Sequence, residues 1–378
     1  MKVFQSVYKQ GDWSNVLQLS DEVQLLLLFG SRLLIADKSI RQQINKAYPN
    51  AAIVGCTTSG EILGATIYDD SLCLTAIAFD SVHVSVCSQS IQEFSNASEL
   101  GKNLVKNLSV EGLQHVLVFS DGQLVNGSEL VDGIANELPQ DVVVTGGLAG
   151  DGSYFKETIV WHDDKVQAGL VALVGLYGGS LQIGHGQLSG WKEFGPLREI
   201  TRSHENILYE LDGKPALGLY KDFLGQHAQN LPASGLLFPL AMRKKNERES
   251  VIRTILNIDE EHQSLIFAGN MPEGADCQLM RANYENLVDG AHGAATNALA
   301  HVNACEPDLA LLISCVGRRL VLSQRVEEEL EIVQESLPEH CAVTGFYSYG
   351  EISPVAPMGR CCLHNQTMTI TLFSEMLT

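Results

Sequence analysis

The chain has 378 residues, of which 45% are apolar and 19% charged, so it is long enough for two domains with buried cores and is not typical of a disordered chain. Acidic residues outnumber basic ones by 45 to 25, for a formal net charge of −20. A surface this negative repels phosphate backbones and anionic lipids, which argues against a nucleic-acid-binding or membrane-surface protein.

Targeting and redox signals indicate a soluble cytoplasmic protein. The first residues contain no long apolar run, and the run Leu25–Phe29 is too short to cross a bilayer. There are nine cysteines, an odd number, and no CxxC pair. We therefore expect reduced, buried thiols rather than a disulfide framework or a zinc ribbon.

A strand–helix–strand unit is predicted near the start of the chain. The apolar run Leu25–Phe29 is typical of a strand buried on both faces, a helix is predicted over 40–47, and a second strand over 51–54. The loop 55–62, Gly-Cys-Thr-Thr-Ser-Gly-Glu-Ile, follows, and then a further strand over 71–79.

The same order recurs twice along the chain. A helix between two buried strands predicts a parallel crossover, and the strand after each loop can add an antiparallel neighbour. The triplets Tyr68-Asp69-Asp70, His162-Asp163-Asp164 and His364-Asn365-Gln366 precede these last strands and are interpreted as equivalent positions. The later copies comprise strands at 116–120, 142–145 and 167–176 with a helix at 128–137 and a loop at 146–151, and strands at 311–314, 342–344 and 367–373 with a helix at 327–336 and a loop at 345–352.

The segment 181–202 interrupts this pattern. A helix over 215–224 follows it, and apolar periodicity is lost over 225–234. We therefore predict an α/β fold of two domains, 1–225 with two repeats and 226–378 with one further repeat, built from mixed sheets with flanking helices.

Common catalytic motifs are missing from the sequence. It contains no GxxxxGK[ST] phosphate loop and no GxSxG elbow, and the HExxH-like start at His204 lacks a second histidine. We therefore expect no enzymatic activity and name no catalytic residue, while an uncharacterised enzyme stays as an alternative.

His185 is the first candidate metal ligand. Glycines flank it on both sides and Trp191 and Phe194 follow closely, a setting that suits an axial haem ligand beneath a planar porphyrin. His364, in the aligned triplet, is the second candidate. The plainer interpretation of any single histidine is a surface residue or a satisfied core residue.

The third glycine loop carries the other candidate site. Phe346, Tyr347 and Tyr349 supply aromatic surface, and Arg318 and Arg319 follow the neighbouring strand, so together they could hold a planar anionic ligand. The alternatives are that the arginines pair with surface acids and that the glycine loops are only tight turns of a duplicated fold.

These segments resemble the FIST family of bacterial signal-transduction sensors, with paired N- and C-terminal FIST domains. The resemblance covers nearly the whole chain, and its motifs are specific in combination. They are the loops at 55–62 and 146–151, Gly190-Trp191 with Phe194-Gly195-Pro196, Thr201-Arg202-Ser203, 209–213, 215–217, 219–221, Ser314-Cys315 with Gly317-Arg318, the loop at 345–352 and 364–367.

The resemblance implies a small-ligand sensor that signals to a histidine kinase or a cyclic-di-GMP enzyme. Stand-alone two-domain members of this size resemble the NosP group of haem-binding nitric-oxide sensors, which act on a separate histidine kinase and often affect biofilm formation. It therefore implies a non-covalent b-type haem, with nitric oxide as the ligand, but carries over no iron ligand. An amino-acid or carboxylate sensor without haem is the alternative, and a homo-oligomer is compatible with either.

Overall fold

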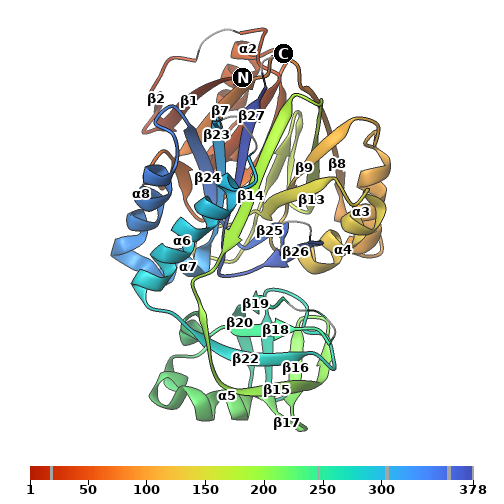
Figure 1. Ribbon diagram of the computed structural model, residues 1–378, viewed down its shortest axis with the longest axis vertical. Helices are drawn as coiled ribbons and strands as arrows, with labels where there is room; N and C mark the ends of the chain where they lie inside the picture. The colour runs from red at the N-terminus through yellow and green to blue at the C-terminus, as the bar shows by residue number, and fades with distance from the viewer. Residues whose placement is uncertain (18–19, 246, 248, 303–305, 356–358, 377–378) are drawn as a thin grey trace.

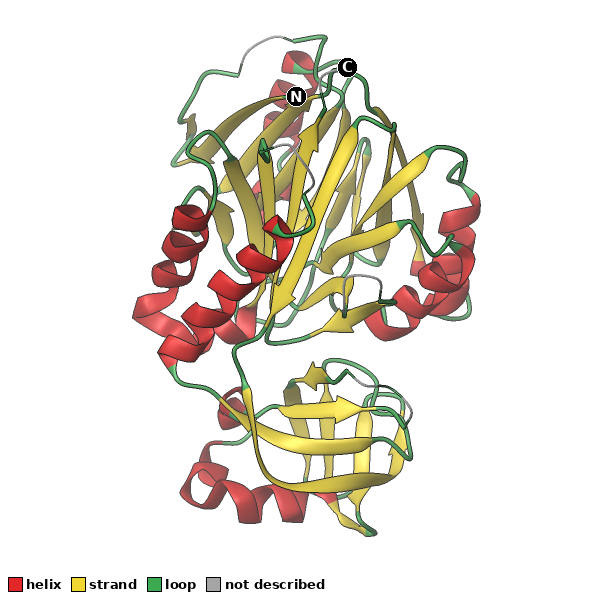
Figure 2. Ribbon diagram, in the orientation of Figure 1, coloured by secondary structure: helices red, strands yellow, loops and turns green. Residues whose placement is uncertain are grey.

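The computed structural model describes residues 1–378 except 18–19, 246, 248, 303–305, 356–358 and 377–378. A large α/β body carries a smaller β domain at one end, and both chain termini lie at the opposite end of the body (Figure 1). Helices flank the outer sides of the strands in the body, as Figure 2 shows. The mixed α/β fold predicted from the sequence is confirmed.

The large body consists of three copies of one unit. In each copy two parallel strands enclose a helix, and the strand after the glycine loop pairs antiparallel with the first of them, as predicted. The first unit comprises β1 (Lys2–Lys9), β2 (Asp12–Trp13), β3 (Leu25–Gly30), α1 (Arg32–Ala36), α2 (Lys38–Ala47), β4 (Ala52–Thr57), β5 (Glu61–Leu63), β6 (Thr66–Tyr68) and β7 (Leu72–Ala78). The second comprises β8 (His83–Ser90), α3 (Ala97–Lys106), β9 (Leu113–Ser120), α4 (Gly127–Glu137), β10 (Val143–Leu148), β11 (Val160–His162), β12 (Lys165–Gln167) and β13 (Leu170–Tyr177). The third comprises β14 (Leu181–Leu188), α6 (Tyr284–Leu299), β23 (Leu309–Cys315), α7 (Val316–Leu322), α8 (Val326–Ser336), β24 (Ala342–Ser348), β25 (Gly350–Pro354), β26 (Cys361–His364) and β27 (Met368–Glu375).

Each unit gives its short hairpin to the sheet of another unit. The hairpin β5–β6 of the first unit pairs with β24 of the third, β11–β12 of the second pairs with β4 of the first, and β25–β26 of the third pairs with β10 of the second. The three exchanges close a ring. Because every sheet is completed by a neighbour, the units form one body rather than three separable domains.

The β domain is inserted into the third unit, between β14 and α6. Its strands follow the order β19-β18-β22-β15-β16-β21-β20, and the boundary expected at residue 225 lies inside it, directly after its helix. It comprises β15 (Lys192–His204), β16 (Ile207–Leu211), β17 (Lys214–Pro215), α5 (Ala216–Leu224), β18 (Leu240–Arg243), β19 (Val251–Arg253), β20 (Ile255–Asp259), β21 (Ser264–Phe267) and β22 (Asp276–Arg281).

The core of the body lies where the three units meet. Phe29, Phe119 and Phe346 come from different units, and their ring centroids lie 4.7 to 6.4 Å apart. An apolar run such as Leu25–Phe29 is buried on both faces because one face meets this centre and the other meets the outer helices.

One glycine recurs at the same place in all three units. A Cβ at Gly55, Gly146 or Gly345 would lie 1.8 to 2.1 Å from a carbonyl oxygen of the parallel strand beside it. The close approach of two backbones therefore requires glycine, which explains why each loop begins with this residue. None of the helices in the described part of the chain is long and apolar enough to span a membrane.

Candidate ligand-binding site

The three glycine loops meet at the end of the body that faces the β domain. The amide of Ser59 donates to the Tyr347 carbonyl, at 2.8 Å, and the amide of Gly152 donates to the Thr58 carbonyl, at 3.2 Å. The amide of Tyr349 in turn donates to the Leu148 carbonyl, at 3.2 Å. Each loop therefore supports the next, at the carboxyl ends of the parallel strands where α/β sheets commonly bind ligands.

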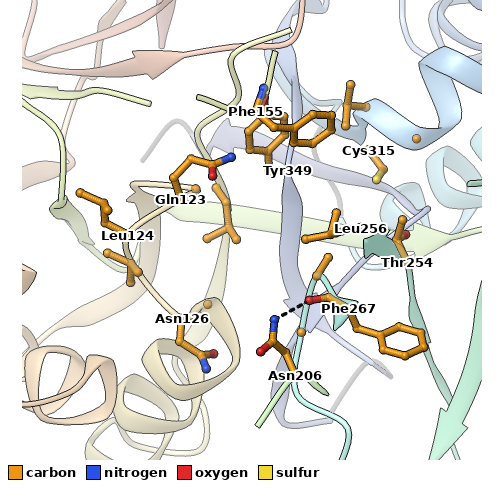
Figure 3. Close-up of a pocket in the computed structure, with 18 of the residues that line it drawn as sticks. Gln123, Leu124, Asn126, Phe155, Asn206, Thr254, Leu256, Phe267, Cys315 and Tyr349 are labelled. Carbon is orange, nitrogen blue, oxygen red and sulfur yellow. Dashed lines mark hydrogen bonds between the residues drawn. The ribbon is translucent and has the colours of Figure 1, made fainter. Parts of the chain in front are cut away.

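A cavity of about 330 Å³ lies between these loops and the β domain (Figure 3). The repeated body contributes Gln123, Asn126, Phe155, Cys315 and Tyr349 to its wall. The inserted domain contributes Asn206, Thr254, Leu256 and Phe267. We call this space the interdomain cavity. Its volume lies at the lower end of the usual range for small-molecule sites.

The wall of the interdomain cavity combines aromatic and amide groups. The Phe155 ring stacks on Tyr349, with centroids 4.6 Å apart and planes 14° apart. The amide of Asn206 donates to the Phe267 carbonyl at 2.8 Å, which orients that side chain at the wall (Figure 3). Burial raises the pKa of the Cys315 thiol and raises the pKa of Tyr349 to about 12, so both side chains are neutral near pH 7.

A second pocket, of about 630 Å³, opens beside the first glycine loop. Arg319 lies in it and bonds to both oxygens of Asp69, at 2.9 and 2.6 Å, and to the Ser59 carbonyl. Glu61 at the base is 2% exposed, and burial raises its pKa to about 7, against hydrogen bonds from Ser71 and Thr58. The one arginine of the predicted pair that reaches a pocket is therefore already bound to a carboxylate.

Comparison with known proteins identifies the family. A FIST N domain matches residues 24–214, which is more than half of the chain, and a FIST C domain matches residues 216–354. The chain belongs to the FIST family. FIST domains are sensory domains of signal-transduction proteins that bind small ligands. The two matched regions meet inside the β domain, so the boundary between them does not separate the repeated body from the insertion.

Two further proteins resemble this FIST protein. The uncharacterized protein MJ1623 of Methanocaldococcus jannaschii is 23% identical over 372 residues, covering 86% of this chain and 69% of that protein. Among solved structures, cyanuric acid hydrolase from A. caulinodans matches 94% of this chain and 91% of its own, at 8% identity and a TM-score of 0.35. A similarity this low bears on neither fold nor activity.

His185 of the FIST protein lies on β14, where it is 6% exposed. The flanking glycines do not open an approach to it, contrary to expectation. A Cβ at Gly184 or Gly186 would lie 2.3 or 2.2 Å from carbonyl oxygens of α6, so these glycines let that helix pack against the strand. The His185 ring stacks on His301, with centroids 5.1 Å apart, and lines none of the five pockets described.

The aromatic residues predicted to accompany His185 lie elsewhere. Trp191 is buried at the junction of the β domain and the body, among Ala241, Ile252, Met280, Leu287 and Leu322. Phe194 is partly buried and packs against the core of the β domain, with its ring 6.4 Å from that of Phe238. The structure therefore does not bring the three residues together around one space.

Arg318 and two aromatics of the third loop, Phe346 and Tyr347, are also placed in the core. Arg318 is fully buried and pairs with Glu329 at 2.7 Å, while Tyr347 donates to the other oxygen of the same carboxylate. Phe346 belongs to the central group of phenylalanines. These side chains tie β24, α7 and α8 together, and none of them lines a pocket described here.

His364 ends β26, where it is 3% exposed and its Nε2 lies 3.0 Å from the Ser353 carbonyl. Burial lowers its pKa to about 4, so it is neutral near pH 7. The predicted alignment of its triplet is wrong for the second unit. The strand pairing shows that the position of His364 in the third unit is equivalent to Tyr68 in the first unit and to Gln167 in the second. His162 instead ends the preceding strand, β11. A left-handed residue marks the true turn in all three copies, at Asp70, Gly169 and Gln366.

The described residues contain no group of three or more His, Cys, Asp and Glu side chains that could hold a metal ion. All eight cysteines that the structure describes are free, and Cys305 lies outside the described residues. Since neither His185 nor His364 faces a described pocket, the residues present do not fit a haem at either predicted position.

Most of the cavity wall was not predicted from the sequence. Thr254 and Asn206 lie in a segment without any repeat, and Phe155 follows the second glycine loop by four residues. Of the aromatics predicted from the third glycine loop, Tyr349 does line the cavity, and Phe155 is a second aromatic residue close to a glycine loop.

Proposed function

We propose that this FIST protein is a sensor that binds a small molecule in the interdomain cavity. The proposal rests on the cavity wall, to which the repeated body and the inserted domain both contribute residues. A ligand in this position contacts two parts of the molecule at once. It therefore favours the arrangement in which both contacts are made, by as much as its affinity differs between the arrangements.

Direct contacts between the two parts include several polar hydrogen bonds. The amide of Asn126 donates to Asn270 Oδ1 at 3.0 Å, Arg253 donates to the Leu363 carbonyl at 2.9 Å, and Gln366 donates to the Leu236 carbonyl at 3.2 Å. Such bonds contribute about 0.5–1.5 kcal/mol each, because water replaces them when the parts separate. Together with the apolar group around Trp191 at the same junction, they hold the arrangement that a bound ligand would favour further.

The cavity wall also supports binding without catalysis. Its ionisable side chains are Glu205, Cys315 and Tyr349, and the thiol and the phenol are neutral near pH 7. No nucleophile paired with a base stands among these groups, so we propose that the ligand leaves unchanged.

A ligand screen tests the proposal. Ligands that bind only the folded protein raise its melting temperature, and those in the cavity should also slow amide hydrogen exchange at 254–256 and 315–317. Leu256, which lines the cavity and is 43% exposed, can be changed to Trp to fill it, with Leu197→Trp, at 52% exposed in the same domain, as the control. A ligand that stabilises Leu256→Trp as strongly as the wild type binds elsewhere, and that result rejects the cavity.

A haem-based nitric-oxide sensor is a second, separate proposal, because no histidine of the described residues lines the interdomain cavity. It is supported by the family and its haem-binding members, and not by the setting of His185 or His364. Haemin added to the purified protein should give a stoichiometric Soret band that moves with nitric oxide, and His185→Ala and His364→Ala should separate the two candidate ligands. If the protein takes up no haem, the haem proposal is rejected and the cavity proposal stands.

We further propose that a separate histidine kinase, or a cyclic-di-GMP enzyme, detects the arrangement of the two parts. The support is that FIST domains serve signal transduction. Kinase autophosphorylation with the ligand-free and ligand-saturated protein tests this. Equal rates in both cases, with the two proteins shown to associate, would reject regulation of that kinase.

A further inference from the structure

The chain passes between the repeated body and the β domain twice, and the two crossings lie against each other. Residues 189–191 lead from β14 into β15, and residues 282–283 lead from β22 into α6. Gly190 has a φ of +77°, and a Cβ there would lie 1.9 Å from the carbonyl oxygen of Asn286, in the first turn of α6. This close approach of two backbones requires glycine.

Arg318 of α7 ties both crossings to the body. Its side chain is fully buried, and its two terminal nitrogens donate to the Ser189 carbonyl and to the Leu287 carbonyl. Trp191 extends this contact, because it packs among apolar side chains of both parts, Leu287 and Leu322 among them. We call these residues the hinge: 189–191, 286–287 and Arg318.

Polar hydrogen bonds join the two parts at another place, which we call the latch. The Asn126 side chain donates to Asn270 Oδ1 at 3.0 Å, the Asn270 backbone amide donates to Ser128 Oγ at 3.1 Å, and Arg253 donates to the Leu363 carbonyl at 2.9 Å. In Figure 1 the two crossings lie on the left of the boundary, whereas α4 and β26, where the body forms the latch, lie on its right. Because water can replace such bonds, the latch is the contact that opens more easily.

The interdomain cavity lies between the hinge and the latch. Gly317, which precedes Arg318, belongs to its wall, and so does Gly127, which lies between the latch residues Asn126 and Ser128. A rotation about the hinge therefore changes the distance between the cavity walls, and changes it most at the latch.

We infer that the β domain turns about this hinge, with Arg318 as the positioning residue that fixes the two crossings, and that the latch controls access to the interdomain cavity. The inference rests on the proposed function for the role of the ligand and on the contacts above for the motion. The packing of Trp191 is non-directional and tolerates a small rotation, whereas the hydrogen bonds of the latch depend on distance and angle. A ligand in the cavity holds the latch closed and leaves the hinge unchanged.

Hydrogen exchange of the ligand-free protein in low concentrations of urea tests the order in which the two contacts open. Amides at 252–254 and 268–270, on the latch, should exchange through a partial opening, whereas amides at 286–290, on the hinge, should exchange only in global unfolding. A single opening shared by these segments, or an earlier opening at 286–290, overturns the inference.

Gly190→Ala tests the contact between the crossings. The added methyl group collides with the Asn286 carbonyl, so exchange at 286–290 should become at least about ten-fold faster. Gly213→Ala is the matched control, because Gly213 lies in the same domain at a φ of +72°, and the added carbon has no neighbour within 4 Å among the described residues. It bears the same backbone strain and should leave exchange at 286–290 at the wild-type rate. Equal rates in the two variants overturn the role of this contact.

Arg318→Met combined with Glu329→Gln tests the positioning residue itself. The two changes remove the guanidinium together with its counter-charge, and glutamine still accepts from Tyr347, so no buried charge is left unpaired. Amides at 286–290 should then exchange in the same partial opening as the latch. Arg32→Met combined with Glu157→Gln, which removes an exposed ion pair of the body, is the control and should keep the wild-type order.

A folded double variant in which 286–290 still exchanges only in global unfolding overturns the role of Arg318. If the double variant does not fold, Arg318→Lys replaces it with the same expectation. Lysine keeps a charge beside Glu329, but its single nitrogen lacks the planar fork that reaches two separate carbonyls.

Failure of the hinge is distinguishable from failure of the proposed function, because these measurements need no ligand. If the hinge and the latch open as expected but no ligand slows exchange at 254–256 and 315–317, the proposed function fails and the hinge stands. If a ligand slows exchange there while the hinge variants behave as the wild type, the cavity is a binding site and only the hinge is wrong.

Discussion

Two buried arginines, one in the repeated body and one at its boundary with the β domain, differ in the groups that accept their hydrogen bonds. Arg318 lies inside the third unit, where Glu329, the Ser189 carbonyl and the Leu287 carbonyl accept its hydrogen bonds. Arg253 lies between the β domain and the body, and the acceptors of its hydrogen bonds are backbone carbonyls. Burial lowers the pKa of Arg253 to about 10.

The difference indicates that contacts within the body are harder to separate than contacts between the body and the β domain. Separating a buried guanidinium from its carboxylate is strongly destabilising, because a buried charge is left without a counter-charge. Separating a guanidinium from neutral carbonyls costs less when the guanidinium becomes hydrated. We therefore expect the body to stay fixed, and the proposed function predicts that a ligand acts at the boundary with the β domain.

The largest effect is expected for Glu329→Gln. The carboxylate accepts from Arg318, Tyr347 and Ser314, so its loss leaves a fully buried guanidinium without a counter-charge. The free energy of unfolding, measured by urea denaturation, should fall by about 3–5 kcal/mol. The adjacent Glu328→Gln is the control: its pair with Arg325 is exposed to solvent, so the variant should unfold at nearly the same urea concentration as the wild type. Equal effects of the two variants would contradict a fixed body.

Glu351, also buried in the body, predicts a pH dependence. Burial raises its pKa to about 8 from the ordinary 4.5, against hydrogen bonds from Ser348 and Thr367. A raised carboxyl pKa means that the folded state binds the proton more tightly, so the stabilisation is complete below pH 4.5 and is lost as the pH rises to 8. From pH 6.5 to 8 the free energy of unfolding should fall by up to about 1.4 kcal/mol per pH unit.

The window above pH 6.5 is chosen to exclude the buried histidines. Burial lowers the pKa of His364 to about 4 and that of His115 to about 3, so their contribution is lost as the pH falls from 6.5 and is constant above it. Glu61, with a pKa raised to about 7, contributes only in the lower part of the window. Glu351→Gln should flatten the slope between pH 7 and 8. A slope that is unchanged in this variant would show that another group titrates.

A smaller effect is expected for Arg253→Met, on the other side of the comparison. The variant loses hydrogen bonds to the Leu363 and Asn270 carbonyls but no longer buries a charge, so the free energy of unfolding should change by about 1 kcal/mol or less. Hydrogen exchange at 252–254 and 363–366 should quicken, because the boundary opens more often. Arg243→Met, at an exposed position in the same domain, is the control. A fall in the free energy of unfolding as large as that of Glu329→Gln would contradict the expected difference between the body and the boundary.

The repeats could be predicted from the sequence because their signals are local. Leu25–Phe29 is apolar throughout since both faces are buried, and helix α2 is recognisable from Ile40 and Ile44 on one face. The hairpin exchange could not be predicted, because β5, β11 and β25 are short strands whose partners lie in another unit. The same limit explains the misplaced triplet, since only strand register separates His162 from Gln167.

The site was less predictable than the fold because adjacent residues have opposite environments. Arg318 and Arg319 are neighbours in the sequence, yet one is fully buried against Glu329 and the other reaches a pocket. The same holds for His185, whose flanking glycines serve the packing of α6. The cavity wall is assembled from many short stretches of the chain between Gly122 and Tyr349, so no local pattern marks it.

The smallest effect on stability is expected for Phe155→Leu, at the edge of the boundary. Phe155 is 39% exposed, has a φ of +52° and holds its ring against Tyr349, whose hydroxyl accepts from the Phe155 amide at 3.2 Å. Leucine keeps the backbone strain and the amide bond but removes the stack, so the free energy of unfolding should fall by about 0.5–1 kcal/mol. Ligand affinity in a calorimetric titration should fall more than stability does, since the ring forms part of the cavity wall. Tyr154→Leu, which is 71% exposed and faces the second pocket, should change neither quantity. If Phe155→Leu lowers stability while ligand affinity stays at the wild-type value, the stack belongs to the fixed body, and the region that responds to ligand begins beyond it, at Thr254 and Asn206.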